Sequence, residues 1–157
     1  MTVGVLVFSN AMRSGETRAG MDQPAADIIG TTLDGQPFRL ADLHGQPVIL
    51  NFWGPSCVPC RSEFPLLEAK QTQLAGDGLR IVGILTDDPP GPARDFVKDY
   101  GATWPTVIDP DKAAKTAYRV VARPQTYFVD RNGVIRSIQV GELTEADFDR
   151  QYAKIAP

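Results

Sequence analysis

The most reactive side chains in this 157-residue chain are its two cysteines, Cys57 and Cys60, which lie three positions apart in WGPSCVPC. A short apolar run, VILNFW, precedes them and a helix-forming segment follows, so Cys57 is expected where a helix begins. Unpaired peptide N–H groups and the helix dipole favour negative charge there, and the cysteine thiolate is the nucleophile of thiol–disulfide exchange. Cys60 would lie one helical turn behind, within disulfide distance and more buried. The spacing therefore predicts a redox pair in which Cys57 attacks and Cys60 resolves.

Other uses of these cysteines fit the sequence less well. One closely spaced pair cannot form a disulfide framework for a whole domain. A zinc site usually needs four Cys or His ligands, and the only histidine, His44, lies in a turn-like HGQP segment. We therefore expect no metal, and no cofactor other than the redox-active disulfide of Cys57 and Cys60.

The composition is that of a folded, soluble domain. Apolar residues make up 43% of the chain and charged residues 22%, and the length suits one domain. The net charge of -3 lacks the basic excess typical of a nucleic-acid-binding surface. Nucleic acid is therefore not an expected partner.

The first 24 residues are predicted to be a tail or linker ahead of a folded domain at residues 25–157. They include an apolar run from Val3 to Phe8, which is too short to span a bilayer because a spanning helix takes about 20 apolar residues. The run is either the remnant of a membrane anchor or an added or poorly ordered terminus. The sequence alone favours neither.

Strands and helices are expected to alternate through the middle of the chain. Residues 48–53 form an apolar run typical of a strand buried on both faces, and residues 79–88 are a second strongly apolar strand candidate. Residues 58–75 favour a helix kinked at Pro65. Residues 89–102 favour a Pro-rich loop and a short helix with Phe96, Val97 and Tyr100 directed inward.

Turn signals predict antiparallel pairs at both ends of the domain. Asp34-Gly35 indicates an early hairpin, and Asn132-Gly133 separates two alternating β-prone runs. Thr144 opens a terminal amphipathic helix. These elements predict an α/β domain with a central mixed sheet, helices on both faces and an N-terminal β-hairpin extension.

The segment NFWGPSCVPCRSEFP resembles the thioredoxin superfamily, and within it the TlpA/ResA/DsbE-like thiol–disulfide oxidoreductases. Members of that group typically show N-F-W-x-x-W/S-C-x-P-C-x-x-E-x-P, and the resemblance runs from about Ala25 to Ile155. It implies a thioredoxin-like fold. Asn51 occupies the position where ordinary thioredoxins carry a buried aspartate, which argues against a cytosolic housekeeping thioredoxin.

The same resemblance implies a proton-transfer role for Glu63. Three residues past Cys60, its carboxylate would return to a neighbouring face of the helix and modulate the second thiol. A glutamate that faces solvent is the alternative.

The resemblance also implies the residues that meet a partner. Pro124, in ARPQTYFVD, matches a cis-proline opposite the cysteines, and the backbone of Arg123 would pair with a bound chain as a strand does. Arg123 departs from the small or β-branched residue usual there, and its charge favours an acidic partner surface as a hypothesis. Trp53 and Pro55 complete the expected binding surface.

The function implied by the resemblance is reduction of protein disulfides outside the cytoplasm. The substrates would carry disulfides or thiols, among them apocytochrome c with its haem-attachment cysteines. An upstream membrane thiol donor would supply electrons, the N-terminus would tether the protein to the membrane, and a monomer is expected. A cytoplasmic location is the alternative.

Two other functions are weighed against this one. A peroxiredoxin-like thiol peroxidase shares the general fold, but its cysteine usually follows Pro-x-x-x-Thr-x-x, whereas GPSCVPC has no such threonine. A non-catalytic binding or chaperone module would not require an intact cysteine pair. The motif alone does not determine the direction of electron flow.

Overall fold

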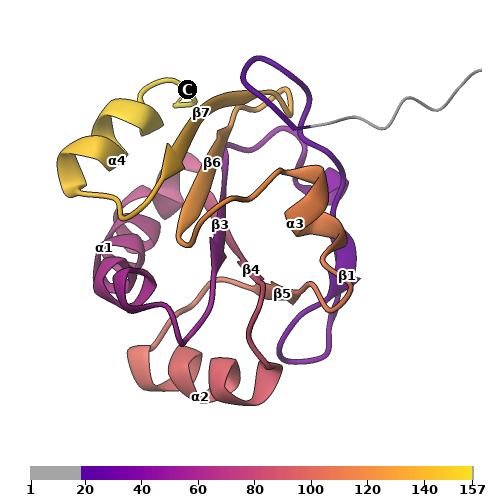
Figure 1. The fold of residues 1–157 in the computed structure, drawn as a ribbon. Coiled ribbons are helices and arrows are strands. Elements are labelled where there is room, and N and C mark those ends of the chain that lie inside the picture. Colours follow the sequence, from indigo (N-terminus) through magenta and orange to yellow (C-terminus); the bar gives the residue numbers. More distant parts are fainter. Residues whose placement is uncertain (1–18, 157) are drawn as a thin grey trace, which may run out of the picture.

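A five-stranded mixed β-sheet of order β5-β4-β3-β6-β7 forms the centre of the protein in the computed structural model, which describes residues 19–156 (Figure 1). A two-stranded sheet, β1-β2, lies beside it. The strands are β1 (Ile29–Thr31), β2 (Pro37–Arg39), β3 (Val48–Trp53), β4 (Arg80–Leu85), β5 (Thr106–Ile108), β6 (Gln125–Val129) and β7 (Ile135–Val140). The α-helices are α1 (Val58–Leu74), α2 (Pro90–Tyr100), α3 (Ala113–Ala117) and α4 (Glu145–Tyr152), with short 3₁₀ turns at η1 (Leu40–Leu43) and η2 (Ala75–Asp77).

The strand directions follow from how the strands are connected. Helical crossovers join β3, β4 and β5, which pair in parallel. The turn at Asn132-Gly133 joins β6 to β7, and the antiparallel β6 also pairs with β3. The mixed sheet expected from the sequence is confirmed, as is the N-terminal hairpin, which turns at Asp34-Gly35.

The central strand β3 is buried along its whole length, and its side chains alternate between two cores. Ile49 and Trp53 lie in the core covered by α1, α2 and α4. Leu50 and Phe52 lie in the opposite core, beneath α3 and the N-terminal hairpin. Figure 1 shows α1 and α4 on one side of the sheet and α3 with β1 on the other.

The chain is already attached to the domain at the first residues that the structure describes. The Ala19 amide donates to the Ala117 carbonyl at 3.1 Å, and the Asp22 amide donates to the Ile135 carbonyl at 2.8 Å. Residues 1–18, which include the apolar run from Val3 to Phe8, lie outside the described residues. Within residues 19–156, no helix combines the length and the apolar character needed to cross a membrane.

The terminal helix α4 begins at Thr144 as the sequence predicts. The Thr144 hydroxyl accepts from the Asp147 amide at 3.1 Å, and the Asp147 carboxylate accepts from the Thr144 amide, which completes a capping box. Lys70 then joins α4 to α1, because its ammonium lies 3.1 Å from Glu145 and 2.7 Å from Asp149.

The helix α2 departs from its expected orientation at one residue. Phe96 is buried and Val97 is half-buried, as predicted, but Tyr100 keeps 42% of its surface exposed. Tyr100 is the last residue of α2, and its ring stacks beside that of Phe96 at 4.2 Å. The tyrosine therefore lies at the rim of the core, and the prediction that it points inward is wrong.

Gly83 provides a test of how tightly β4 packs against Trp53 of β3 and Thr106 of β5. A Cβ atom there would lie 2.6 Å from Thr106 Oγ1 and 2.7 Å from Trp53 Nε1. Gly83→Ala should therefore lower the free energy of unfolding by about 1–3 kcal/mol, measured by urea denaturation.

The matched control is Gly76→Ala, where an added Cβ meets nothing within 4 Å. Its stability should stay near that of the wild type or rise by a few tenths of a kcal/mol. Equal unfolding free energies for the two variants would contradict the packing described.

Candidate active site

The two cysteines occupy the first turn of α1 and are joined by a disulfide. Cys57 is the N-cap residue, and its sulfur accepts a hydrogen bond from the Cys60 amide at 3.2 Å. Cys57 keeps 8% of its surface exposed, whereas Cys60 is completely buried. In the reduced protein the same amide would donate to a thiolate at Cys57, the arrangement that lowers a thiol pKa at a helix N-terminus.

The turn before the helix holds Cys57 at the C-terminal end of the central strand β3. β3 ends at Trp53, and the Cys57 amide donates back to the Gly54 carbonyl at 3.1 Å. Pro59 lies in the first helical turn, where a missing peptide N–H leaves no intrahelical bond unmade. Val58, between the cysteines, is 70% exposed and presents an apolar surface beside the disulfide.

Glu63 lies one turn further along α1 and is 1% exposed. Its Oε1 accepts from Asn51 Nδ2 at 2.7 Å, and its Oε2 accepts from the Leu143 amide at 2.9 Å. Burial raises the pKa of Glu63 to about 7, although the hydrogen bonds from Leu143 and Asn51 favour the charged form and oppose the shift. The alternative of a solvent-facing glutamate is therefore wrong.

The side-chain amide of Asn51 contacts the Glu63 carboxyl group and has both a donor and an acceptor atom. Its amide nitrogen donates both to Glu63 and to Thr126 Oγ1, at 3.0 Å for the latter. Its Oδ1 is buried and has no hydrogen-bond partner among residues 19–156. A half-turn of the amide would present this oxygen to a protonated Glu63. The amide thus carries both a donor and an acceptor that Glu63 could use, one helical turn beyond the buried Cys60.

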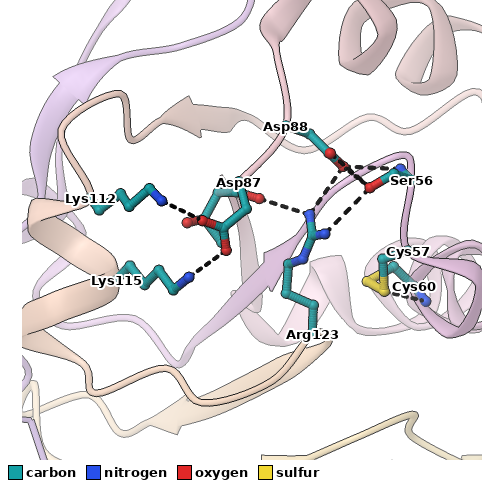
Figure 2. A network of polar contacts seen from close by, with 9 residues as sticks. Ser56, Cys57, Cys60, Asp87, Asp88, Lys112, Lys115 and Arg123 are labelled. Atoms are coloured by element: carbon teal, nitrogen blue, oxygen red, sulfur yellow. Dashed lines mark hydrogen bonds and ion pairs between the residues drawn. A yellow bond between two sulfur atoms is a disulfide. The ribbon is translucent and has the colours of Figure 1, made fainter.

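The loop before β6 completes the same edge of the sheet. The Arg123-Pro124 peptide bond is cis, and Pro124 is buried. Gln125, the next residue, pairs with Phe52 of β3, so the loop lies at the end of β3 from which the cysteine turn departs. Arg123 contacts Ser56, the residue before Cys57, as Figure 2 shows.

The guanidinium of Arg123 is bound within the chain. Its Nη1 donates to the Thr86 carbonyl at 2.8 Å and lies 3.0 Å from Asp88 Oδ2. Because Asp88 already offsets its charge, the expectation that Arg123 attracts an acidic partner is not supported. Asp88 lacks any motif that would have revealed it in the sequence, since it is 35 residues away from Arg123.

Trp53 and Pro55 occupy different environments. Trp53 is fully buried, and its indole packs against Phe64 at 4.7 Å and Phe96 at 5.3 Å between ring centroids. It supports the active-site turn from beneath, so the prediction that it contacts a partner is wrong. Pro55 is half-buried in the turn itself. An exposed apolar residue that sequence reasoning missed is Val121, 81% exposed and two positions before Arg123.

Fold and site together define a class of protein, the thioredoxin-fold thiol–disulfide oxidoreductases. Comparison with known proteins agrees: residues 21–138 match the AhpC/TSA family. The chain is 31% identical to the thiol–disulfide oxidoreductase ResA of Geobacillus kaustophilus, over 99% of this chain and 88% of the relative.

Solved structures give the same picture. A thiol:disulfide interchange protein of the thioredoxin family from Chlorobium tepidum superimposes with a TM-score of 0.78 at 29% identity, covering 87% of this chain and 97% of that one. A secreted Mycobacterium tuberculosis disulfide oxidoreductase gives 0.73 at 27% identity, covering 80% and 94%. The chain belongs to the AhpC/TSA family and, within it, to the ResA-like thiol–disulfide oxidoreductases. Its substrates are proteins that carry disulfides.

The raised pKa of Glu63 makes a prediction about stability. Its pKa rises from 4.5 to about 7 on folding, so between these values the folded state holds a proton that the unfolded state has lost. Stability should therefore fall as the pH rises through this window. The wild type should lose about 3 kcal/mol between pH 4.5 and pH 8 that Glu63→Gln does not lose, measured by urea denaturation of the oxidised protein.

Glu68→Gln, on the same helix, is the matched control and should follow the wild-type pH dependence. Parallel curves for the wild type and Glu63→Gln would contradict the assignment of this titration to Glu63.

Proposed function

We propose that this protein is a reductase of protein disulfides that acts outside the cytoplasm, with Cys57 as the attacking and Cys60 as the resolving residue. The observation that carries the proposal is the difference in exposure between the two sulfurs. Cys57 reaches the surface at the N-terminus of α1, whereas Cys60 is fully buried. A disulfide on a folded partner can therefore approach Cys57 alone.

The reaction proceeds by two exchanges. The Cys57 thiolate attacks one sulfur of the partner's disulfide, a mixed disulfide forms, and the other partner sulfur leaves as a thiolate. Cys60 then loses its proton and attacks Cys57, which forms the intramolecular disulfide and releases the second partner sulfur. The partner gains two electrons and the cysteine pair loses them. Glu63, buried one helical turn beyond Cys60, is the group suited to take the Cys60 proton.

Electrostatics around the pair supports reduction as the direction. Glu63 lies buried one helical turn beyond Cys60, and above its raised pKa of about 7 its negative charge disfavours a second one on Cys60. The disulfide carries no charge, so the oxidised pair is favoured over the dithiolate forms. A protein whose oxidised state is favoured gives up its electrons readily.

The surface around Cys57 suits an extended segment of a partner. Val58, between the two cysteines, is 70% exposed, and Val121, in the loop before the cis-proline, is 81% exposed. No hydrogen bond within residues 19–156 uses the peptide N–H of Arg123. This group is therefore free to pair with the backbone of a bound segment, as in β-strand addition.

The proposed location and partners rest on similarity. The match to ResA covers 99% of this chain and so includes nearly all of the first 24 residues, which supports a native N-terminal segment. One structural relative is described as secreted. We therefore propose an N-terminal membrane tether, an upstream membrane thiol donor and apocytochrome c among the substrates.

The order of attack is tested by trapping. Reduced Cys60→Ser should accumulate a mixed disulfide with a disulfide-bonded substrate peptide, because the resolving sulfur is missing. Cys57→Ser should accumulate at least tenfold less, since its remaining thiol is buried. Non-reducing electrophoresis with mass spectrometry measures both, and stronger trapping by Cys57→Ser would reverse the assigned roles.

The peroxidase alternative is separated by hydrogen peroxide. The reduced wild type should consume it no faster than a free thiol of similar acidity does. Rapid consumption with a sulfenic acid at Cys57 would favour the peroxidase instead.

A further inference from the structure

Three loops meet beside Cys57, and one ion pair joins them (Figure 2). Asp88, in the loop between β4 and α2, accepts from the Ser56 amide at 2.9 Å and from the Ser56 hydroxyl at 2.7 Å. Arg123, in the loop before β6, lies 3.0 Å from the same carboxylate, and its Nη2 donates to Ser56 Oγ at 3.3 Å. We call Ser56, Asp88 and Arg123 the clasp. It links the residue before the nucleophile to two distant segments.

The clasp is better shielded from water than an ordinary surface ion pair. The side chains of Asp88 and Arg123 are 9% and 21% exposed. Burial alone would raise the pKa of Asp88, but the hydrogen bonds from Ser56 and Arg123 outweigh it, so the net shift is downward. Asp88 is therefore ionised at neutral pH, and both charges of the clasp persist where screening by solvent is reduced.

The active-site turn is fitted closely around this ion pair. A Cβ atom on Gly54 would lie 2.2 Å from both Arg123 Nη1 and Asp88 Oδ2, so only glycine fits there with the pair in place. The Gly54 carbonyl in turn accepts from the Cys57 amide. The ion pair thus touches the backbone that fixes the position of Cys57.

We propose that Asp88 and Arg123 are positioning residues whose paired, opposite charges set how readily Cys57 forms its thiolate. The negative charge of Asp88 disfavours a thiolate at Cys57, and the positive charge of Arg123 favours one. In the intact clasp these two effects largely cancel. Other charged side chains lie on the same elements. Arg61 and Glu63 are on α1, and Asp87, the neighbour of Asp88, pairs with Lys112 and Lys115 (Figure 2). The proposal rests on Cys57 as the nucleophile.

The charge effect makes the two single substitutions act in opposite directions. Arg123→Gln leaves the Asp88 carboxylate unbalanced and should lower the thiolate fraction of Cys57. Asp88→Asn leaves the guanidinium unbalanced and should raise it. A clasp that only holds the loops together would give changes of the same sign, because either substitution would loosen the same turn.

The experiment measures the alkylation rate of Cys57 by iodoacetamide in the reduced protein across a range of pH, with the modified residue identified by mass spectrometry. Below the midpoint of the wild-type profile, Arg123→Gln should react about three- to tenfold more slowly and Asp88→Asn about three- to tenfold faster. The double variant should return to within about twofold of the wild type. Arg123→Lys, which keeps the charge, should stay within about threefold.

The control is Arg39→Gln, which removes an ion pair with Asp27 on the N-terminal hairpin and should leave the profile unchanged. Shifts of the same sign in both single variants, or no shift in either, would overturn the proposal. If Arg123→Gln does not fold, Asp88→Asn decides alone, and a rate no faster than the wild type overturns it.

No partner protein enters the alkylation experiment, so its outcome is independent of the proposed substrates. Successful trapping by Cys60→Ser together with unshifted alkylation would reject the clasp proposal and leave the proposed function standing. A shifted alkylation profile without trapping would support the clasp proposal and reject the proposed function.

Discussion

The site depends on one constraint, which is that the N-terminus of α1 must lie at the edge of the sheet with a cysteine as its cap. β3 meets this constraint because it is buried along its whole length and cannot shift without exposing one of two cores. Trp53 anchors the end of the strand between Phe64 and Phe96, and Gly54 turns the chain toward Cys57. The buried strand β3 therefore holds the Cys57 sulfur at the surface, and the first turn of α1 places the Cys60 sulfur in the core.

The buried polar groups beneath this helix are explained by chemistry better than by stability. A carboxylate in the core is unfavourable, and the hydrogen bonds from Asn51 and Leu143 offset only part of that cost. The Oδ1 of Asn51, which has no hydrogen-bond partner in the described part of the chain, adds a further cost. Both features make sense if Glu63 must change protonation state while Cys60 is attacking or being released. The stability given up here is provided elsewhere, by the two apolar cores.

Local signals in the sequence were sufficient for several of the elements and for the cysteines. The apolar run of β3, the turn at Asn132-Gly133 and the capping box at Thr144 each involve residues close together in the chain. Contacts between distant residues were not readable in this way. Nothing near Arg123 in the sequence indicates that Asp88 neutralises it, and an apolar residue such as Trp53 or Tyr100 carries no local mark of whether it faces the core or the surface.

The most direct test of the account is the reduction potential of the Cys57–Cys60 pair, obtained by equilibrating the protein with defined glutathione mixtures and trapping the free thiols. We expect a value near that of thioredoxin, about -270 mV, because the oxidised pair is favoured beside a buried carboxylate. A value near that of a strong oxidant, about -120 mV, would contradict it and would mean that the protein introduces disulfides.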